Sequence, residues 1–242
     1  MIWLHGYGWF AGTRRGHLEI AMSTLLASAG FITVSIEYRL SSEALFPAQI
    51  HDVKAGIRWL RANAATYGID PDHIGIGGAS AGGGLAALAG LTGDLPELEG
   101  SSGSPGYSSR VQAVAVASSP SDFLRPGGEM RNDVDGPVSW LFGGTVAEKR
   151  NLMELASPVT HVSRDAPPFL IAHGTLDETV PFDQARRLYE ALQNAGATAE
   201  FFPLEGIYHN WMAQAESKIP DREDTWRLGP MSLPFLRRHL VR

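Results

Sequence analysis

The sequence predicts an α/β fold, with a mostly parallel central sheet and helices on both of its faces. Short apolar runs typical of buried strands alternate with helical patterns from one end of the chain to the other. The 242 residues, 44% hydrophobic and 19% charged, are also enough to build one large core. Because no internal repeat or second domain is visible, we expect a single domain over residues 1–242.

The first half of the chain predicts three strands, each followed by a helix. Helices are indicated by apolar residues three or four positions apart, as at Leu18, Met22 and Leu25, and by a terminating glycine such as Gly30. The expected elements are a strand at Met1–His5, a helix at about Arg14–Ala29, a strand at Phe31–Glu37, a helix at about Ala48–Tyr67, a strand that ends at Ser80 and a helix at Ala81–Leu91.

The second half predicts the same alternation, with two irregular segments. Residues 93–109 are rich in Gly, Ser and Pro and predict an exposed loop. Residues 118–168 contain only a short helical pattern, and we expect them to form a small cover over the site, because loops this long are usually functional. The other expected strands are Val111–Ala117, Phe169–His173 and Ala197–Phe202. The expected helices are a short one at about Ala147–Leu155, a long one at Pro181–Gly196, and a last one at about Asp224–Leu240 that is interrupted near Gly229-Pro230.

Composition argues against several classes of protein. A net charge of −6 and a pI near 5.7, without a basic tract, disfavour partners such as nucleic acid or an anionic membrane surface. The absence of cysteine excludes disulfides and thiolate metal sites. No apolar run has the length of a membrane span, and no signal-peptide pattern opens the chain. We expect a cytoplasmic protein, or a secreted one if an N-terminal segment is missing.

The strongest motif is Gly78-Ala79-Ser80-Ala81-Gly82, between a strand and a helix. Small residues on both sides of Ser80 are typical of a sharp turn that raises a serine hydroxyl above the sheet as a nucleophile. A glycine-rich helix start also serves close packing or phosphate binding. The lysine of a phosphate-binding P-loop is absent, and the partial dinucleotide pattern in this region falls inside the helix.

A serine nucleophile needs a base and a carboxylate that orients the base. In a parallel sheet, segments that follow strands converge at one edge, so Ser80, Asp177 and His209 are expected to meet there. They also occur in the Ser, Asp, His order typical of this turn. Glu178 is the alternative carboxylate, because it adjoins Asp177 in the same post-strand loop.

The reaction also needs backbone N–H groups that stabilise an oxyanion. Ala81, directly after the proposed nucleophile, supplies one such donor. The turn Gly6-Tyr7-Gly8, directly after the first strand, is positioned to supply the others.

These motifs together resemble the α/β-hydrolase carboxylesterases of the hormone-sensitive-lipase-like and bacterial feruloyl-esterase-like group, and the resemblance covers nearly the whole chain. The matching segments are His5-Gly6-Tyr7-Gly8-Trp9, Tyr38-Arg39-Leu40, Phe46-Pro47-Ala48 with Asp52, Gly78-Ala79-Ser80-Ala81-Gly82-Gly83, Ala156-Ser157-Pro158, His173-Gly174-Thr175 with Asp177, and His209.

The resemblance implies a triad of Ser80, Asp177 and His209, with oxyanion donors at Tyr7, Gly8 and Ala81. It also implies a structural pair between Arg39 and Asp52. Two positions depart from the family pattern: Tyr7 replaces a glycine, which keeps the N–H group, and Ala79 stands where many relatives have an acid.

The family fold normally has two strands before the one that begins here at Ile2. We therefore expect a sheet that lacks its first two strands, and a truncated or misannotated start. The strand Phe31–Glu37 would then have an unpaired edge, which a homodimer contact can cover.

The resulting prediction is a serine carboxylesterase that forms an acyl-enzyme and uses no metal or cofactor. Its substrate is expected to be a short-chain or aromatic ester, a small molecule held by Trp9, Trp140, Phe142, Tyr208 and Trp211. A feruloyl or acetyl-xylan esterase, an arylformamidase and a peptidase remain open within the fold. From a different class, a non-catalytic hydrolase-like receptor for small molecules also remains open.

Overall fold

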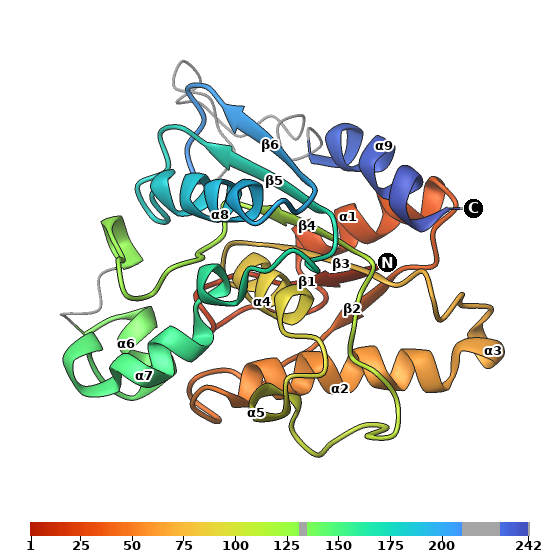
Figure 1. Ribbon diagram of the computed structural model, residues 1–242, viewed down its shortest axis with the longest axis horizontal. Helices are drawn as coiled ribbons and strands as arrows, with labels where there is room; N and C mark the ends of the chain where they lie inside the picture. The colour runs from red at the N-terminus through yellow and green to blue at the C-terminus, as the bar shows by residue number, and fades with distance from the viewer. Residues whose placement is uncertain (131–134, 210–227, 242) are drawn as a thin grey trace.

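Six parallel strands form one twisted sheet at the centre of the protein (Figure 1). The computed structural model describes residues 1–130, 135–209 and 228–241. Along the sheet the strands follow the order β2-β1-β3-β4-β5-β6. Their bounds are Ile2–Leu4 for β1, Val34–Ile36 for β2, Gly75–Ala79 for β3, Ala113–Ala117 for β4, Phe169–Gly174 for β5 and Ala199–Leu204 for β6. The predicted mostly parallel sheet is therefore confirmed.

Alternating residues in the strands face two separate hydrophobic layers. In β4, with the sequence Ala-Val-Ala-Val-Ala, Val114 and Val116 face one layer and the three alanines face the other. All five residues are fully buried. Both faces of the sheet are thus covered, which is typical of a parallel sheet.

The long helices divide between these two layers (Figure 1). Helices α2, α4 and α8 pack on one face, and α1 and α9 pack on the other. Their bounds are His17–Ser28 for α1, Ala48–Ala62 for α2, Ser80–Leu91 for α4, Asp183–Asn194 for α8 and Leu228–Leu240 for α9. Within the described ranges, no helix is both long and apolar enough to cross a membrane.

Several element bounds differ from the sequence-based expectation. The predicted helix at about Ala48–Tyr67 is two helices, because Asn63 leaves helical geometry between α2 and the short α3, Ala64–Tyr67. From Leu228 to Leu240, helix α9 is continuous through Gly229-Pro230 and Pro234, so the interruption predicted there is wrong. The first residues of the predicted helix, 224–227, lie outside the described residues.

The predicted exposed loop at residues 93–109 is partly wrong. It contains the helix α5, Pro96–Glu99, whose Leu98 is fully buried. Glu99 accepts hydrogen bonds from Lys54 (2.7 Å) and Ser109 (2.7 Å), and a short one from Arg58 (2.5 Å). These contacts attach the loop to α2.

In this Glu99 cluster, defined by Lys54, Arg58 and Glu99, the two cations are buried and the carboxylate is partly buried, with 19% of its side chain exposed. The side chain of Lys54 is 0% exposed and that of Arg58 is 2% exposed. Burial by itself raises the pKa of Glu99, but hydrogen bonds from Lys54, Ser109 and Arg58 and the charge of Lys54 outweigh it and hold the pKa below its ordinary value. The carboxylate therefore remains charged and compensates the two buried cations.

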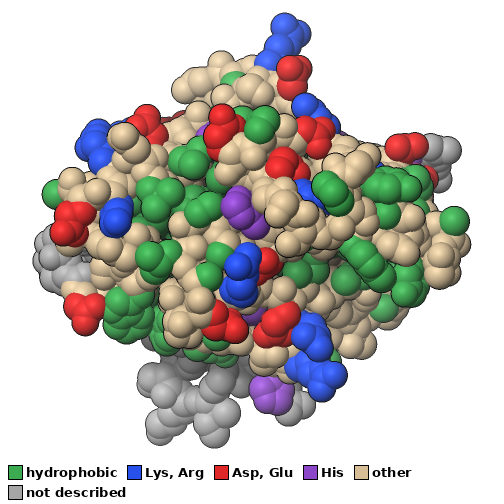
Figure 2. Space-filling view, turned by 90° about the horizontal axis from the view of Figure 1, so that it is seen from below, with side chains coloured by type: hydrophobic (Ala, Val, Ile, Leu, Met, Phe, Trp, Pro, Cys, Tyr) green, Lys and Arg blue, Asp and Glu red, His purple; other side chains and the backbone are tan. Residues whose placement is uncertain are grey.

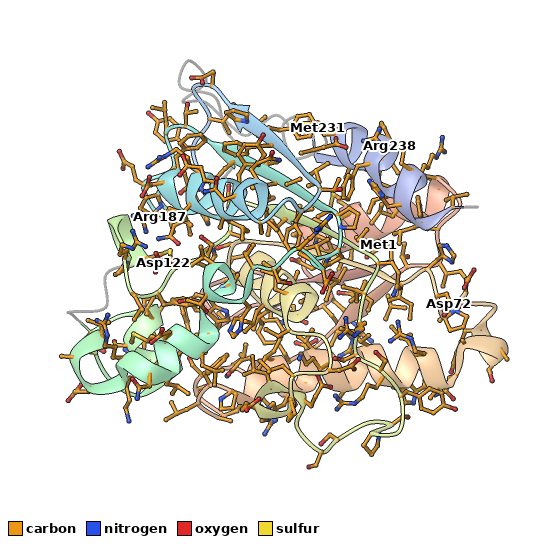
Figure 3. All side chains as sticks on the ribbon, viewed as in Figure 1. Met1, Asp72, Asp122, Arg187, Met231 and Arg238 are labelled. Atoms are coloured by element: carbon orange, nitrogen blue, oxygen red, sulfur yellow. The ribbon has the colours of Figure 1, made fainter. Side chains whose placement is uncertain are left out.

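The segment 118–168 between β4 and β5 contains short helices. They are η1 (Gly128–Met130), α6 (Pro137–Phe142), α7 (Val146–Ala156) and η2 (Pro158–His161). Asp122 and Arg187 approach to 3.4 Å and join the start of this segment to α8 (Figure 3). Gln184 of α8 also accepts the backbone N–H groups of Ser121 and Asp122. The start of the segment is therefore held against the sheet-covering helices.

The face of the protein that carries α2 has a mixed surface. Figure 2 shows acidic and basic side chains interspersed with hydrophobic ones on that face. Arg39 and Asp52 form one of the paired contacts of α2, with two nitrogen–oxygen distances of 2.8 Å. The pair that the family resemblance implies is thus formed, and it attaches the loop after β2 to α2.

Candidate active site

A strained turn carries Ser80 between β3 and α4. Its φ angle of 53° lies in the left-handed region, which non-glycine residues rarely adopt. A Cβ atom on Gly78 would come within 2.6 Å of the Gly82 carbonyl carbon, and one on Gly82 within 2.3 Å of the His5 oxygen. Only glycine at these two positions lets the turn close, so the Gly-x-Ser-x-Gly pattern has a direct steric cause.

Hydrogen bonds connect Ser80, His209 and Asp177 in a chain. The Ser80 Oγ atom lies 3.0 Å from Nε2 of His209, and Nδ1 of the same ring lies 2.8 Å from Oδ2 of Asp177. These residues follow β3, β6 and β5, and parallel strands bring all three to one edge of the sheet. Asp177 rather than Glu178 makes the contact with the histidine.

Asp177 is held in its charged form. Its side chain has no exposed surface, and burial by itself raises the pKa. Hydrogen bonds from His173 and His209 outweigh that effect and lower the pKa to about 2. An ionised Asp177 accepts a hydrogen bond from the N–H at Nδ1 of His209. The other ring nitrogen, Nε2, then has a free lone pair and can accept a hydrogen bond from the Ser80 hydroxyl.

Two further contacts orient the Asp177 carboxylate. The backbone N–H of Val180 donates to Oδ1 at 2.8 Å. Nε2 of the buried His173 lies 3.2 Å from Oδ2 and 2.8 Å from the Val180 carbonyl oxygen. These groups fix the loop after β5 around the carboxylate.

The loop after β1 lies beside Ser80 and has an uncommon backbone. Tyr7, Gly8 and Trp9 have φ angles of 66°, 59° and 62°, so three consecutive residues are left-handed. The N–H of Ser41 donates to the Trp9 carbonyl at 2.9 Å. We call residues 6–9 the oxyanion loop, because Tyr7 and Gly8 are the expected donors.

A cavity of about 600 Å³ opens in front of Ser80. The proposed donors Tyr7, Gly8 and Ala81 all line it, together with His209. Most of its remaining wall is apolar and comes from the oxyanion loop, α1, the segment 118–168 and the loop after β5; these residues include Trp9, Leu18, Met130, Pro137, Val138 and Val180. The cavity is therefore suited to a small apolar acyl or aromatic group.

The aromatic residues predicted for the substrate pocket do not all lie at the cavity. Trp9 lines the cavity, whereas Phe142 is 1% exposed and packs in the core with Phe46 and Phe123. The prediction that Phe142 holds substrate is wrong, because the helical register of α6 turns this ring inward.

Of the other three suggested aromatics, Trp140 and Tyr208 are not among the described residues that line the cavity. Trp140 is 42% exposed and meets the cavity residue Phe10 edge-on, with ring centroids 5.3 Å apart. Tyr208 precedes His209 but is not part of the wall formed by the described residues. Trp211 lies outside the described residues.

Sequence reasoning missed Glu19, a carboxylate in the cavity wall. It is the third residue of α1 and only 2% exposed. An acid in the first turn of a helix is common, since the helix dipole stabilises it there, so its position alone carries no signal. Only the fold shows that this acid lies buried beside Ser80.

Comparison with known proteins finds a matching family and similar sequences. The model of the BD-FAE family matches residues 1–192. Two curated relatives from Mycobacterium tuberculosis are similar in sequence: "Probable carboxylic ester hydrolase LipM", 37% identical over 78% of this chain and 43% of the relative, and "Esterase LipQ", 36% identical over 86% and 49%. The chain thus spans about half the length of these relatives.

Solved structures show the same architecture over nearly the whole chain. The "Truncated form of carbohydrate esterase from gut microbiota" superposes with a TM-score of 0.87 and 32% identity, covering 100% of this chain and 85% of that one. Apo esterase 2 of Thermogutta terrifontis superposes with a TM-score of 0.80 and 27% identity, covering 98% and 82%. The α/β-hydrolase fold expected from the motifs is therefore present, and this chain belongs to the BD-FAE family.

Proposed function

We propose that this protein is a serine carboxylesterase that hydrolyses short-chain or aromatic carboxylic esters through an acyl-enzyme. The observation that carries the proposal is the hydrogen-bonded chain from Ser80 through His209 to Asp177 at the mouth of an apolar cavity. The printed names of the two mycobacterial relatives, a carboxylic ester hydrolase and an esterase, support the same chemistry.

In the acylation step, Ser80 Oγ attacks the ester carbonyl carbon while its proton moves to Nε2 of His209. The carbonyl π electrons move to the oxygen, which becomes an oxyanion. When the tetrahedral species collapses, the bond to the alcohol oxygen breaks and His209 returns the proton to the leaving alkoxide. Asp177 stays ionised and stabilises the imidazolium.

In the deacylation step, water attacks the acyl carbon while one of its protons moves to Nε2 of His209; the bond from that carbon to Ser80 Oγ then breaks, His209 returns the proton to Oγ, and the carboxylic acid leaves. In the proposed mechanism both tetrahedral oxyanions accept hydrogen bonds from the N–H groups of Tyr7, Gly8 and Ala81; these residues line the same cavity as Ser80, which supports this role. The loss of one such donor typically costs about 2.7–4 kcal/mol of transition-state stabilisation.

The small cavity supports short or aromatic acyl groups. We propose that the segment 118–168 acts as a cover, since its residues Ser118, Pro120, Met130 and Pro137 contribute to the cavity wall. Hydrolysis of chromogenic esters with acyl chains of two, four and twelve carbons tests this size limit. We expect the twelve-carbon ester to be the poorest substrate of the three.

The decisive assay is hydrolysis of a chromogenic acetate or butyrate ester by the wild-type protein and by Ser80→Ala. We expect the variant to retain less than about one part in 10⁴ of kcat, because the covalent step is lost. Equal rates would contradict the esterase mechanism and favour a small-molecule receptor. A wild-type protein that cleaves N-formyl arylamines or peptides faster than esters would instead indicate an arylformamidase or a peptidase.

We also propose that the outer edge of β2 pairs with a second copy of the chain. Val34, Ser35 and Ile36 pair with β1 on one side, and no described strand pairs with them on the other. Free strand edges readily form such contacts. Light scattering at micromolar concentration tests this proposal: a dimer that Ser35→Pro converts to a monomer supports it, and a monomeric wild-type protein rejects it.

A further inference from the structure

His173 is a fully buried histidine that contacts Asp177 and takes no part in the proposed proton transfers. It is the fifth of the six residues of β5, a strand with neighbours on both sides in the sheet. The ring of Phe182 meets its imidazole edge-on, with ring centroids 6.0 Å apart. The imidazole is therefore fixed in the interior of the protein, where each polar atom needs a partner.

The two ring nitrogens of His173 have different surroundings. Nε2 lies 2.8 Å from the carbonyl oxygen of Val180 and 3.2 Å from Oδ2 of Asp177. Both neighbours are acceptors, so Nε2 carries a proton. Nδ1 is buried without a hydrogen-bond partner among the described residues, and a proton there would be a donor without an acceptor. His173 is therefore a neutral ring with its proton on Nε2.

The loop after β5 folds back onto this Nε2–H group. Val180 accepts a hydrogen bond from His173 through its carbonyl and donates its own N–H to Oδ1 of Asp177 at 2.8 Å. The other carboxylate oxygen, Oδ2, lies beside the same Nε2–H group and accepts from Nδ1 of His209. His173 thus acts on both carboxylate oxygens, directly on Oδ2 and through Val180 on Oδ1.

Backbone contacts alone do not orient the Asp177 carboxylate. The loops that carry Asp177 and His209 are joined by a hydrogen bond of 3.0 Å from the Leu176 N–H to the Ile207 carbonyl. They also approach closely, because a Cβ atom on Gly174 would lie 2.2 Å from that same carbonyl oxygen. These contacts fix the two backbones, but the carboxylate still rotates about its side-chain bonds unless donors around its oxygens hold it.

We infer that His173 is a positioning residue of the triad: its Nε2–H group holds the Asp177 carboxylate in the orientation that accepts Nδ1–H of His209. This inference rests on the proposed esterase function. His173 is not among the described residues that line the cavity, so it acts through Asp177 and not on substrate. The role requires a donor at the position of Nε2 and nothing at the position of Nδ1.

Three variants separate this donor from the volume of the ring. His173→Gln places an amide N–H near the position of Nε2, His173→Asn places one near the position of Nδ1, and His173→Leu removes both. His161→Leu is the control. It removes a histidine whose Nε2 also lies 2.8 Å from a backbone carbonyl, that of Leu155, but which belongs to the short helix η2.

For each protein, kcat and KM are measured with a chromogenic butyrate ester, and rates are normalised by active-site titration with a fluorophosphonate. The dependence of kcat on pH is recorded as well. Proton NMR gives a readout that needs no turnover, because the Nδ1–H of His209 that bonds Asp177 has a low-field resonance. Thermal unfolding shows whether each variant is folded.

His173→Leu and His173→Asn should both lower kcat by about 10- to 100-fold, because a misaligned acid costs less than the roughly 10⁴-fold loss caused by replacing it. KM should stay nearly unchanged, since no substrate contact is lost. The low-field resonance of His209 should move upfield. His173→Gln should stay within about fivefold of wild type, because its amide N–H replaces Nε2–H. His161→Leu should match wild type.

The acid limb of the kcat profile should move to lower pH in His173→Leu and His173→Asn, because the imidazolium form of His209 loses its aligned anion. A loss of packing alone would lower the amount of active protein and leave the limb in place. Other titratable residues around this site are the same in all these variants; they are Glu19 in the cavity wall, Glu178 after β5, and Glu205 and Tyr208 after β6.

The comparison of the two amides decides the outcome even if His173→Leu does not fold. Equal losses of kcat in His173→Gln and His173→Asn would overturn the inference, because the position of the donor would then have no effect. An unchanged kcat per titrated site with lower thermal stability in His173→Asn would also overturn it and leave His173 a packing role.

The two proposals fail in different ways. Wild-type protein without esterase activity removes the proposed function and this inference with it. Active wild-type protein whose His173→Leu and His173→Asn variants keep kcat, the pH profile and the His209 resonance removes only the inference.

Discussion

The Asp177 and Glu99 clusters have the same plan, with one carboxylate between two basic side chains; the Asp177 side chain is fully buried and that of Glu99 is 19% exposed. Asp177 lies between His173 and His209, and Glu99 lies between Lys54 and Arg58. In both clusters, hydrogen bonds outweigh burial and hold the carboxylate pKa below its ordinary value. The two clusters differ in what lies at their ends.

The Asp177 cluster has an open end. The His209 side chain is 24% exposed, and its second ring nitrogen reaches Ser80 at the cavity. The Glu99 cluster is closed, because Lys54 and Arg58 also donate to the carbonyl oxygens of Thr92 and Ser102. Buried charge alone therefore does not mark a reactive site. A reactive site also needs a group that can take up or release a proton and that faces a cavity where substrate can bind.

Of the variants that distinguish the two clusters, Asp177→Asn is expected to have the largest effect, a loss of kcat. An asparagine side chain favours the wrong tautomer of His209, and such a change costs about 10⁴-fold in kcat in a related triad. Steady-state hydrolysis of a chromogenic butyrate ester measures the loss. The matched variant Glu99→Gln should keep kcat per folded molecule. A loss of less than tenfold in Asp177→Asn would mean that the two clusters do not differ as described.

A smaller effect, on stability and not on rate, is expected in Glu99→Ala. Removal of one partner leaves Lys54 and Arg58 buried without an anion, which typically costs about 3–5 kcal/mol. Urea unfolding followed by circular dichroism measures this change. Glu97→Ala, an exposed acid of the same short helix α5, is the control and should change stability little. Equal midpoints for the two variants would argue against the closed cluster.

The smallest effect is the acid dependence of stability that Asp177 contributes. Its pKa is lowered in the folded state from 3.8 to about 2, so the charged form stabilises the fold above pH 4, and this stabilisation is lost as the pH falls toward 2. The shift corresponds to about 2 kcal/mol. Unfolding free energies measured between pH 2 and pH 5 should show a shallower slope in Asp177→Asn. Identical slopes would mean that Asp177 does not hold its charge as described.

Much of the architecture could be predicted from local patterns. The alternation of strands and helices implies a parallel sheet, and a parallel sheet brings the segments after its strands to one edge. Ser80, Asp177 and His209 could therefore be grouped without any coordinates. The sharp turn around Ser80 could also be predicted locally, from the glycines at 78 and 82, because a turn with no room for a Cβ atom must use glycine.

Contacts between distant elements could not be predicted in this way. Phe142 and Trp140 are two residues apart in α6, yet the first lies in the core and the second is exposed, which depends on how α6 packs against Phe46 and Phe123. Glu99 belongs to a segment whose composition is typical of an exposed loop. Its contact with α2 depends on two cations more than 40 positions earlier in the chain.

The sequence by itself determined the order of strands and helices, the sharp turn at Ser80 and the identity of the residues that meet there, because each of these depends on neighbours in the chain or on the common direction of parallel strands. Only the tertiary structure decided which acids are buried and which aromatics line the cavity. Burial depends on the packing of elements that are far apart in the sequence, and no local pattern encodes the environment of Glu19, Glu99 or Phe142.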